Sequence, residues 1–260
     1  MLKNKKKIKI LIMGLPGSGK TYFAKRVVKM LKADWFNADN VRGKYNDWDF
    51  SQEGILRQVN RMQTLAKNSK KKFVVADFIC PLKKQIQIFK PNFIIWMDTI
   101  KKSRYSRINK IFKKPYKYNL RFKEKNLEIN LMQLKDKLFH YKWNNTSPTI
   151  QMMGRFQPWH YGHRKLFEKC ILKTGQVNLM VKNVKKDKDN PYNYLQVKKK
   201  IEKDLINFKK RIKISLVPEI QEICFGRKVG YSIKKINLGK KIEKISATKI
   251  RKQLRQKNSI

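Results

Sequence analysis

The sequence is poor in cysteine and has no long apolar run. Its three cysteines, Cys80, Cys170 and Cys224, are far apart and form no C-x-x-C pair, which argues against a disulfide framework and against a zinc site. The longest apolar runs, such as Phe93–Met97, are far too short to cross a bilayer. The apolar segment Ile8–Met13 leads directly into a glycine-rich loop, unlike the apolar core of a signal peptide. We therefore expect a cytoplasmic protein with no membrane partner.

Acidic residues are also scarce: 18 stand against 64 basic residues, which gives a formal net charge of +46 over 260 residues. Such a charge favours nucleic-acid binding, because lysines neutralise phosphates and release counterions. The alternative is a compositional bias. Lysines number 51 against 13 arginines and occur throughout the chain, whereas bidentate phosphate and base contacts favour arginine. On that interpretation any affinity for nucleic acid is incidental to the charge.

Apolar runs of strand type alternate with segments of helical spacing along the whole chain. In the first half, strands are expected at Ile8–Met13, from Trp35–Phe36, at Phe73–Ala76 and at Phe93–Met97, and helices at Lys20–Lys32, Phe50–Lys67 and Leu127–Leu138. In the second half, strands are expected at Ile150–Met153, Val177–Val181 and Ile212–Val217, and helices at Gly162–Lys173, Tyr194–Phe208 and Thr248–Arg255.

This alternation predicts an α/β protein of two Rossmann-like three-layer domains with mainly parallel sheets. The polar, proline-ended stretch Asn144-Asn-Thr-Ser-Pro148 is the best candidate for a connector. We therefore expect one domain over residues 1–143, a linker at 144–148 and a second domain over 149–260.

Gly14-Leu-Pro-Gly17-Ser18-Gly19-Lys20-Thr21 fits the pattern G-x-x-x-x-G-K-[ST], and it stands between an expected strand and an expected helix. Glycines in such a loop let backbone N–H groups face a triphosphate, and the helix N-terminus adds its dipole. Lys20 is expected to reach the β- and γ-phosphates of ATP, and the Thr21 hydroxyl to hold Mg²⁺.

Asp39 follows the short second strand, at the edge where ligands meet a parallel sheet. There its carboxylate could accept the proton of a substrate hydroxyl, although a turn or cap aspartate is the simpler alternative. Arg42, one helical turn later, could hold an anionic acceptor.

These residues resemble the adenylylsulfate kinases over roughly residues 8–110. Phe36-Asn-Ala-Asp39-Asn-Val-Arg42 is similar to that family's L-D-G-D-N-x-R segment, Asp49-Phe50-Ser-Gln-Glu53 to its G-F-S-x-E, and Phe78-Ile-Cys-Pro81 to its F-I-S-P. The resemblance implies that Asp39 is the catalytic base, that Arg42 binds the substrate and that Phe50 stacks on its adenine.

Three positions depart from that family's pattern. Asn37 replaces its first aspartate, while Ile55 and Gln58 fall on a substrate-binding arginine and asparagine. The basic segment Lys101–Lys114 lies where such kinases carry a lid, and a solvated basic face is an equally good interpretation.

The second half opens with Gly154-Arg155-Phe156-Gln-Pro-Trp-His160-Tyr-Gly-His163, which contains two of the chain's three histidines. One helical turn separates the two imidazoles, so both can donate to phosphate oxygens whose charge grows in a transition state. Near the other end, Ile245-Ser246-Ala-Thr248-Lys-Ile-Arg251 opens the last expected helix. Ser246 or Thr248 can cap that helix, whose free N–H groups form an anion site beside Arg251.

Together the two motifs resemble the HxGH nucleotidyltransferase superfamily over residues 150–256. The short spacing, with Asn190-Pro-Tyr between the motifs, is most similar to archaeal-type nicotinamide-mononucleotide adenylyltransferases, with cytidylyltransferases close behind. The resemblance implies that the nucleotide is bound by Gly154, Arg155, Phe156, His160, His163, Asn190, Ser246, Thr248 and Arg251. It implies ATP, or CTP, as the nucleotide donor.

The two halves together suggest consecutive reactions: an ATP- and Mg²⁺-dependent kinase makes a phosphomonoester, and a nucleotidyltransferase joins AMP or CMP to it. A ribosylnicotinamide-type kinase with nicotinamide-mononucleotide adenylyltransferase is one such pair. Two alternatives are a polynucleotide-end kinase or nucleic-acid-binding protein that uses the +46 charge, and a chain in which one half is a catalytically silent scaffold. The expected partners are therefore small phosphate-bearing substrates.

Overall fold

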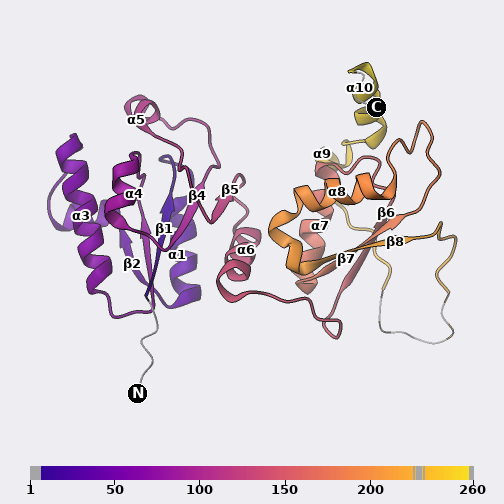
Figure 1. Cartoon of the computed structure of the whole chain (residues 1–260), viewed down its shortest axis with the longest axis horizontal. Coiled ribbons are helices and arrows are strands. Elements are labelled where there is room, and N and C mark those ends of the chain that lie inside the picture. Colours follow the sequence, from indigo (N-terminus) through magenta and orange to yellow (C-terminus); the bar gives the residue numbers. More distant parts are fainter. Residues whose placement is uncertain (1–6, 225, 227–229, 231, 258–260) are drawn as a thin grey trace. The chain divides into compact units, whose positions relative to one another are not determined.

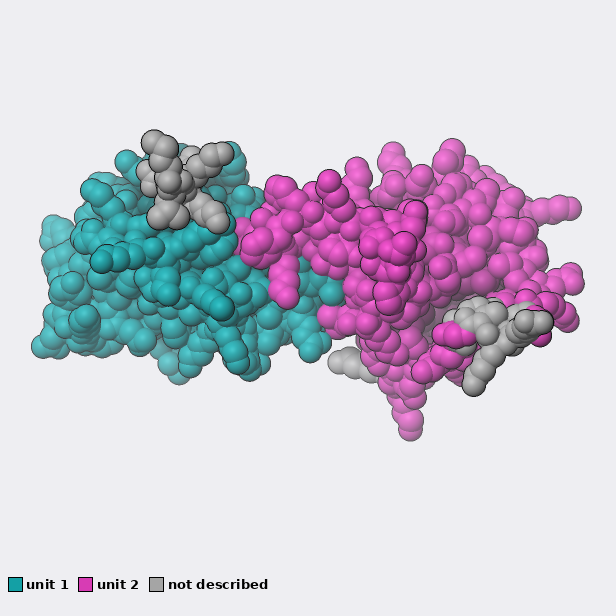
Figure 2. Space-filling model, turned by 90° about the horizontal axis from the view of Figure 1, so that it is seen from below, with its two compact units in different colours: residues 1–134 teal, residues 135–260 magenta. Residues whose placement is uncertain are grey.

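The computed structural model describes residues 7–224, 226, 230 and 232–257, apart from the side chain at position 241. It divides into two compact units, Met1–Leu134 and Lys135–Ile260, shown in different colours in Figure 2. Within the described residues, no helix is both long and apolar enough to cross a membrane.

The first unit is built on a parallel five-stranded sheet of order β2-β3-β1-β4-β5 (Figure 1). Its strands are β1 Ile8–Met13, β2 Asp34–Asn37, β3 Phe73–Asp77, β4 Phe93–Met97 and β5 Leu120–Phe122. Its helices are α1 Lys20–Leu31, α2 Ala38–Lys44, α3 Gln52–Asn68, α4 Lys83–Phe89 and α5 Ser106–Ile111, and α6 Leu127–Phe139 crosses the division between the units.

Both faces of this sheet are covered, because its central strands are apolar on both sides. All five residues of β3 are buried. On one face Leu11 and Ala76 pack against Met62 of α3 and Phe89 of α4. On the other face lies α1, where Phe23 makes an edge contact with a β5 ring at 5.3 Å between centroids.

The second unit contains a parallel three-stranded sheet of order β6-β7-β8. Its elements are β6 Ile150–Gly154, α7 Tyr161–Thr174, β7 Val177–Lys182, α8 Tyr194–Asp204, the 3₁₀ turn η1 Ile206–Arg211, β8 Ile212–Val217, α9 Lys240–Glu243 and α10 Ala247–Gln256. The α/β class with parallel sheets, predicted from the alternating pattern, is confirmed.

The helix expected over Tyr194–Phe208 is wrong beyond Asp204, where the chain tightens into η1. A 3₁₀ turn has three residues per turn, so Leu205, Phe208 and Arg211 fall on one side, and all three are buried. Phe208 thereby reaches Phe167 of α7 at 5.2 Å between ring centroids. Packing against α7 thus selects the tighter turn.

The helix expected from Phe50 instead begins at Gln52, because the Ser51 hydroxyl accepts a hydrogen bond from the Gly54 N–H and caps α3. Phe50 therefore lies in a loop, where half of its surface is exposed.

Residues 144–148, the expected linker, lie within the second unit, where they are hydrogen-bonded to the fully buried Gln176. The Gln176 amide nitrogen donates to the carbonyl of Asn144 at 2.6 Å and to the Thr149 hydroxyl at 2.6 Å. Earlier in the chain, Asp136 of α6 forms a buried two-point ion pair with Arg211, with distances of 2.6 and 2.7 Å. These contacts hold the end of α6 and the following loop to the second sheet.

Candidate phosphate-binding sites

The glycine-rich loop after β1 has the backbone that its glycines allow. Gly14, Gly17 and Gly19 have φ angles of 148°, 84° and 89°, which side chains rarely tolerate. A Cβ at Gly14 would also lie 2.5 Å from the carbonyl oxygen of Met97 in β4. Gly19 is the N-cap of α1, and no side chain caps this end. The loop therefore presents a helix N-terminus with free N–H groups, the arrangement that binds phosphate.

Lys20 lies folded onto this loop, with its Nζ donating to the carbonyl of Leu15 at 2.9 Å. Burial lowers its pKa to about 8, against the opposing effect of Asp77 and Asp39. The Ser18 hydroxyl of the same loop is fully buried and has no hydrogen-bond partner in the structure. Buried polar groups usually have a hydrogen-bond partner, so this hydroxyl in the expected triphosphate cradle is free to bond to a phosphate oxygen.

Asp77, at the end of β3, lies outside the motifs predicted from the sequence and forms the centre of this site. Its Oδ2 accepts from the Thr21 hydroxyl at 2.9 Å and from the Asn37 amide at 3.0 Å, and its Oδ1 accepts from the Trp35 indole at 2.6 Å. Burial raises its pKa, while these donors oppose the rise. The only sequence signal for it is an apolar strand, Phe73–Ala76, that is followed by an acid; its place beside Thr21 comes from the pairing of β3 with β1.

Asn37, where the resembled family carries an aspartate, has two tasks. Its side-chain oxygen accepts from the Asn40 N–H and caps α2, while its amide donates to Asp77. A second carboxylate at this position would repel the buried Asp77 and raise its pKa further. An asparagine here instead donates to Asp77 and avoids that repulsion.

Asp39 lies exposed in the first turn of α2. It is near enough to Lys20 and to Arg42 to affect the pKa of both. Arg42 is buried, donates to the carbonyls of Asp47 and Asp49 at 2.9 and 2.8 Å, and stacks on the Phe50 ring at 4.6 Å. The structure thus brings Arg42 and Phe50 together, with the guanidinium already holding the loop between α2 and α3.

Ile55 and Gln58 lie on α3. Gln58 is buried and donates to the carbonyl of Ala38, and its side-chain oxygen has no partner in the structure. The expected lid segment, Lys101–Lys114, contains α5. Lys125 lies further along the chain, outside the predicted site, and its Nζ donates to the carbonyl of Gly17 at 2.9 Å. A second cation therefore contacts the phosphate loop.

In the second unit, the histidine motif begins at the end of β6 and runs into the first turn of α7. His160 is the N-cap of α7, and its Nδ1 accepts from the Gly162 N–H at 3.1 Å. The Nδ1 of His163 accepts from the His160 N–H at 3.4 Å, and the two rings stack with centroids 3.8 Å apart. Because each Nδ1 is an acceptor, we assign the proton of each neutral ring to Nε2. The pair therefore carries two N–H donors.

Burial lowers the pKa of both histidines, and that of His163 falls to about 3 because the neighbouring His160 adds to the effect. Both imidazoles are thus neutral donors at physiological pH. Phe156 and Trp159 enclose His163, with ring centroids at 5.0 and 5.5 Å. A Cβ at Gly154 would lie 2.9 Å from the Phe156 ring, so a larger residue here would displace that ring.

Arg251 of α10 lies buried, with one nitrogen donating to the Gln157 carbonyl and another to Asp189, both at 2.8 Å. Its Nε is buried without a partner, as is the side-chain oxygen of Asn190. Arg251 also donates to the Thr248 hydroxyl at 3.3 Å. The Arg251 Nε–H could donate to a polar ligand, and the Asn190 oxygen could accept from one.

Two further expected residues, Ser246 and Arg155, make fewer contacts in the structure. Ser246 is the N-cap of α10, but its side chain makes no capping hydrogen bond, so the expected side-chain cap is absent. Arg155 is exposed and lies near enough to Asp187 to help lower the pKa of that acid. Among the residues that the structure describes, no group of three or more histidine, cysteine or acidic side chains could hold a metal ion.

No family model and no curated protein matches this chain, but solved structures resemble about half of it. An APS kinase from Mycobacterium tuberculosis is 21% identical, covering 51% of this chain and 97% of that protein, with a TM-score of 0.43. A shikimate kinase from Aquifex aeolicus is 11% identical over 51% of this chain and 99% of its own, with a TM-score of 0.38. At these identities and TM-scores, the likeness assigns neither a family nor an activity to this chain.

Proposed function

We propose that the first unit is an ATP-dependent kinase for a small alcohol, of adenylylsulfate-kinase type. The observation that carries this proposal is the contact between Thr21 at the start of α1 and the buried Asp77, directly behind the phosphate loop. Lys20 supplies a cation next to the loop, where it would bind the β- and γ-phosphates.

Mg²⁺ fits this site because the neighbouring oxygens of Thr21 and Asp77 are hard ligands, 2.9 Å apart. The metal would neutralise charge on the transferred phosphoryl group. Trp35 and Asn37 donate hydrogen bonds that fix Asp77 and oppose the rise in its pKa that burial causes. The chain's own part is therefore to position the triphosphate and to hold one carboxyl group beside it.

Asp39 is the proposed proton acceptor of the kinase step. The substrate hydroxyl oxygen would attack the γ-phosphorus, its proton would pass to Asp39, and ADP would leave with the bond electrons. The exposed carboxylate near Lys20 supports this role. The stacked pair Arg42 and Phe50 would border the acceptor, so an acceptor with a flat ring, such as adenylylsulfate, is proposed.

We infer that the second unit transfers AMP or CMP from a nucleoside triphosphate to a phosphomonoester. The neutral His160–His163 pair supports this role, because two fixed N–H donors suit phosphate oxygens that gain charge in the transition state. An acceptor phosphate oxygen would attack the α-phosphorus while the α–β bridging bond breaks and pyrophosphate leaves. The acceptor is already an anion, so this step needs no base.

The whole chain would then perform consecutive steps: a hydroxyl is phosphorylated and the product is capped with a nucleotide. Ribosylnicotinamide phosphorylation followed by adenylyl transfer to nicotinamide mononucleotide is one pair of this kind. The proposal is tested by assaying ADP formation and pyrophosphate release separately, with Lys20→Ala and His160→Ala variants. Each variant should abolish one activity and retain the other; loss of neither would refute both assignments.

A second candidate, phosphorylation of polynucleotide ends, is favoured by the segment 101–125. Eleven of its 25 residues are basic, against 64 of 260 in the whole chain. The rings of Tyr105 and Tyr116 in this segment are exposed. The Arg104 guanidinium lies 4.9 Å from the Tyr105 ring centroid, and the Lys83 ammonium lies 5.1 Å from that of Tyr116. Exposed rings beside cations suit the stacking of single-stranded bases. Oligonucleotide binding with a steep salt dependence and competition with a small-molecule acceptor would support it.

A further inference from the structure

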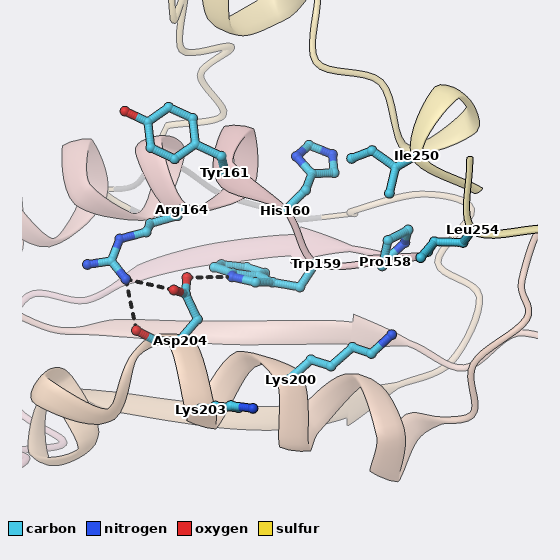
Figure 3. A pocket seen from close by; sticks show the side chains of 10 residues that line it. All are labelled: Pro158, Trp159, His160, Tyr161, Arg164, Lys200, Lys203, Asp204, Ile250 and Leu254. Atoms are coloured by element: carbon cyan, nitrogen blue, oxygen red, sulfur yellow. Dashed lines mark hydrogen bonds and ion pairs between the residues drawn. The ribbon is translucent and has the colours of Figure 1, made fainter. Parts of the chain in front are cut away.

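A pocket of about 640 Å³ lies in the second unit between the start of α7, α8 and α10 (Figure 3). It is lined by Trp159 and His160, by Lys200 and Lys203 of α8, and by Ile250 and Leu254 of α10, among others. Its volume is that of a small-molecule site. Because His160 lines it, the pocket adjoins the proposed site of nucleotidyl transfer.

The aromatic wall of this pocket is held in place from two sides. The indole nitrogen of Trp159 donates to Asp204 at 2.8 Å, and Arg164 donates to the other oxygen of the same carboxylate at 2.8 Å (Figure 3). The Trp159 ring also stacks on His163, which stacks on His160. The position of the indole is therefore fixed without a ligand, and its ring packs directly on the histidine pair.

The charge of the pocket favours an anion. Arg164 is offset by its ion pairs with Asp204 and Glu168. Among the described residues, Lys200 and Lys203 form no ion pair with a carboxylate, and the Nζ of Lys200 lies 3.0 Å from the centroid of the Tyr192 ring. Lysine is abundant throughout this chain, so the charge alone would identify nothing. The fixed indole and the apolar side chains of α10, next to His160, are what distinguish this pocket.

We propose that this pocket binds the acceptor of nucleotidyl transfer, as a phosphomonoester that carries a planar ring. This inference rests on the function proposed for the second unit. The ring would lie against Trp159 and the apolar side chains of Ile250 and Leu254, with Lys200 and Lys203 balancing the phosphate charge. A phosphate oxygen then forms the new bond to the α-phosphorus at the His160 end, and pyrophosphate leaves with the electrons of the broken bond.

The experiment compares ring-bearing acceptors with a ring-free one on the full chain. Mononucleotides of nicotinamide, adenine, guanine, cytosine and uracil are tested against ribose 5-phosphate, by binding titration and by pyrophosphate release with ATP or CTP. Lys203→Glu reverses one pocket charge, and Lys199→Glu makes the same change at an exposed position of α8 that does not line the pocket.

At least one mononucleotide should bind tenfold more tightly than ribose 5-phosphate, and Lys203→Glu should raise its Kd and KM about tenfold, leaving the KM of the triphosphate unchanged. Lys199→Glu should change neither by more than twofold. A different result would overturn the pocket assignment and leave the proposed function standing: pyrophosphate release that requires His160, but is equal for acceptors with and without a ring and is unchanged in Lys203→Glu. Ring-dependent binding that Lys203→Glu weakens, without pyrophosphate release from any acceptor, would overturn the proposed function and the acceptor role with it.

Discussion

The ionisation of His163 gives a quantitative test of the second site. The pKa of His163 is lowered from the ordinary 6.5 to about 3, because burial disfavours the charged ring and His160 lies against it. A His160→Gln variant removes the second cause only. The pKa of His163 should then rise but remain below 6.5, since burial is the larger cause.

The same shift predicts how stability depends on pH. The unfolded chain takes up a proton at this histidine below about pH 6.5, whereas the folded chain does so only near pH 3, so the contribution of His163 is full above pH 6.5 and is lost as pH falls. At about 1.36 kcal/mol per pKa unit, the loss is about 3 kcal/mol by pH 4.5 and about 5 kcal/mol below pH 3.

The chain has only three histidines, so NMR of histidine-labelled protein resolves the titration directly. His140→Gln removes the signal of the one ring outside the motif, so the remaining two signals belong to His160 and His163. The signal that is lost in His163→Asn is then that of His163. The free energy of unfolding is measured at pH 4.5 and pH 7.5 in the native chain and in His163→Asn. Between pH 7.5 and 4.5 it should fall by about 3 kcal/mol more in the native chain than in the variant. A His163 pKa near 6.5, or an equal fall in both, would refute the buried, stacked geometry.

Three further predictions concern the first site and the fold. The affinity for ATP should weaken as pH rises through about 8, where Lys20 loses its charge, and a Lys20→Arg variant titrated over pH 6.5–9.5 should lack this step. Trp35→Phe removes one donor from the buried Asp77, which should raise the Mg²⁺ concentration for half-maximal kinase activity severalfold with a smaller effect on the ATP KM; equal effects on both would contradict a positioning role. Arg211→Gln leaves Asp136 buried without its cation and should cost about 3–5 kcal/mol of stability, measured by urea unfolding of the full chain; a loss below about 1 kcal/mol would show that the pair is solvated.

Strands and long helices were predictable from the sequence because their patterns are local. The apolar runs of β1, β4 and β8 have the same limits in the structure as in the prediction. The short α2, α4 and α5, each of six or seven residues, and the three-residue β5 were missed. Elements of that length have too few residues to show a period, and tertiary packing decides them.

The site was predictable where one motif contains its residues and not where folding joins distant ones. The phosphate loop and the histidine pair lie within single short segments. Asp77 becomes part of the first site only because β3 pairs with β1 in register, Ile12 opposite Asp77, and nothing in the spacing of 56 residues from Thr21 indicates it. Likewise, no pattern shows that Arg42 is used on backbone carbonyls.

The most direct test of the account is the number of nucleotide sites on the chain. Calorimetric titration with Mg²⁺ and a non-hydrolysable ATP analogue, repeated with a CTP analogue, should find two triphosphate sites. Lys20→Ala should remove one of them and His160→Ala the other. A single site that both variants weaken, or binding indifferent to both, would contradict two independent phosphate-handling units.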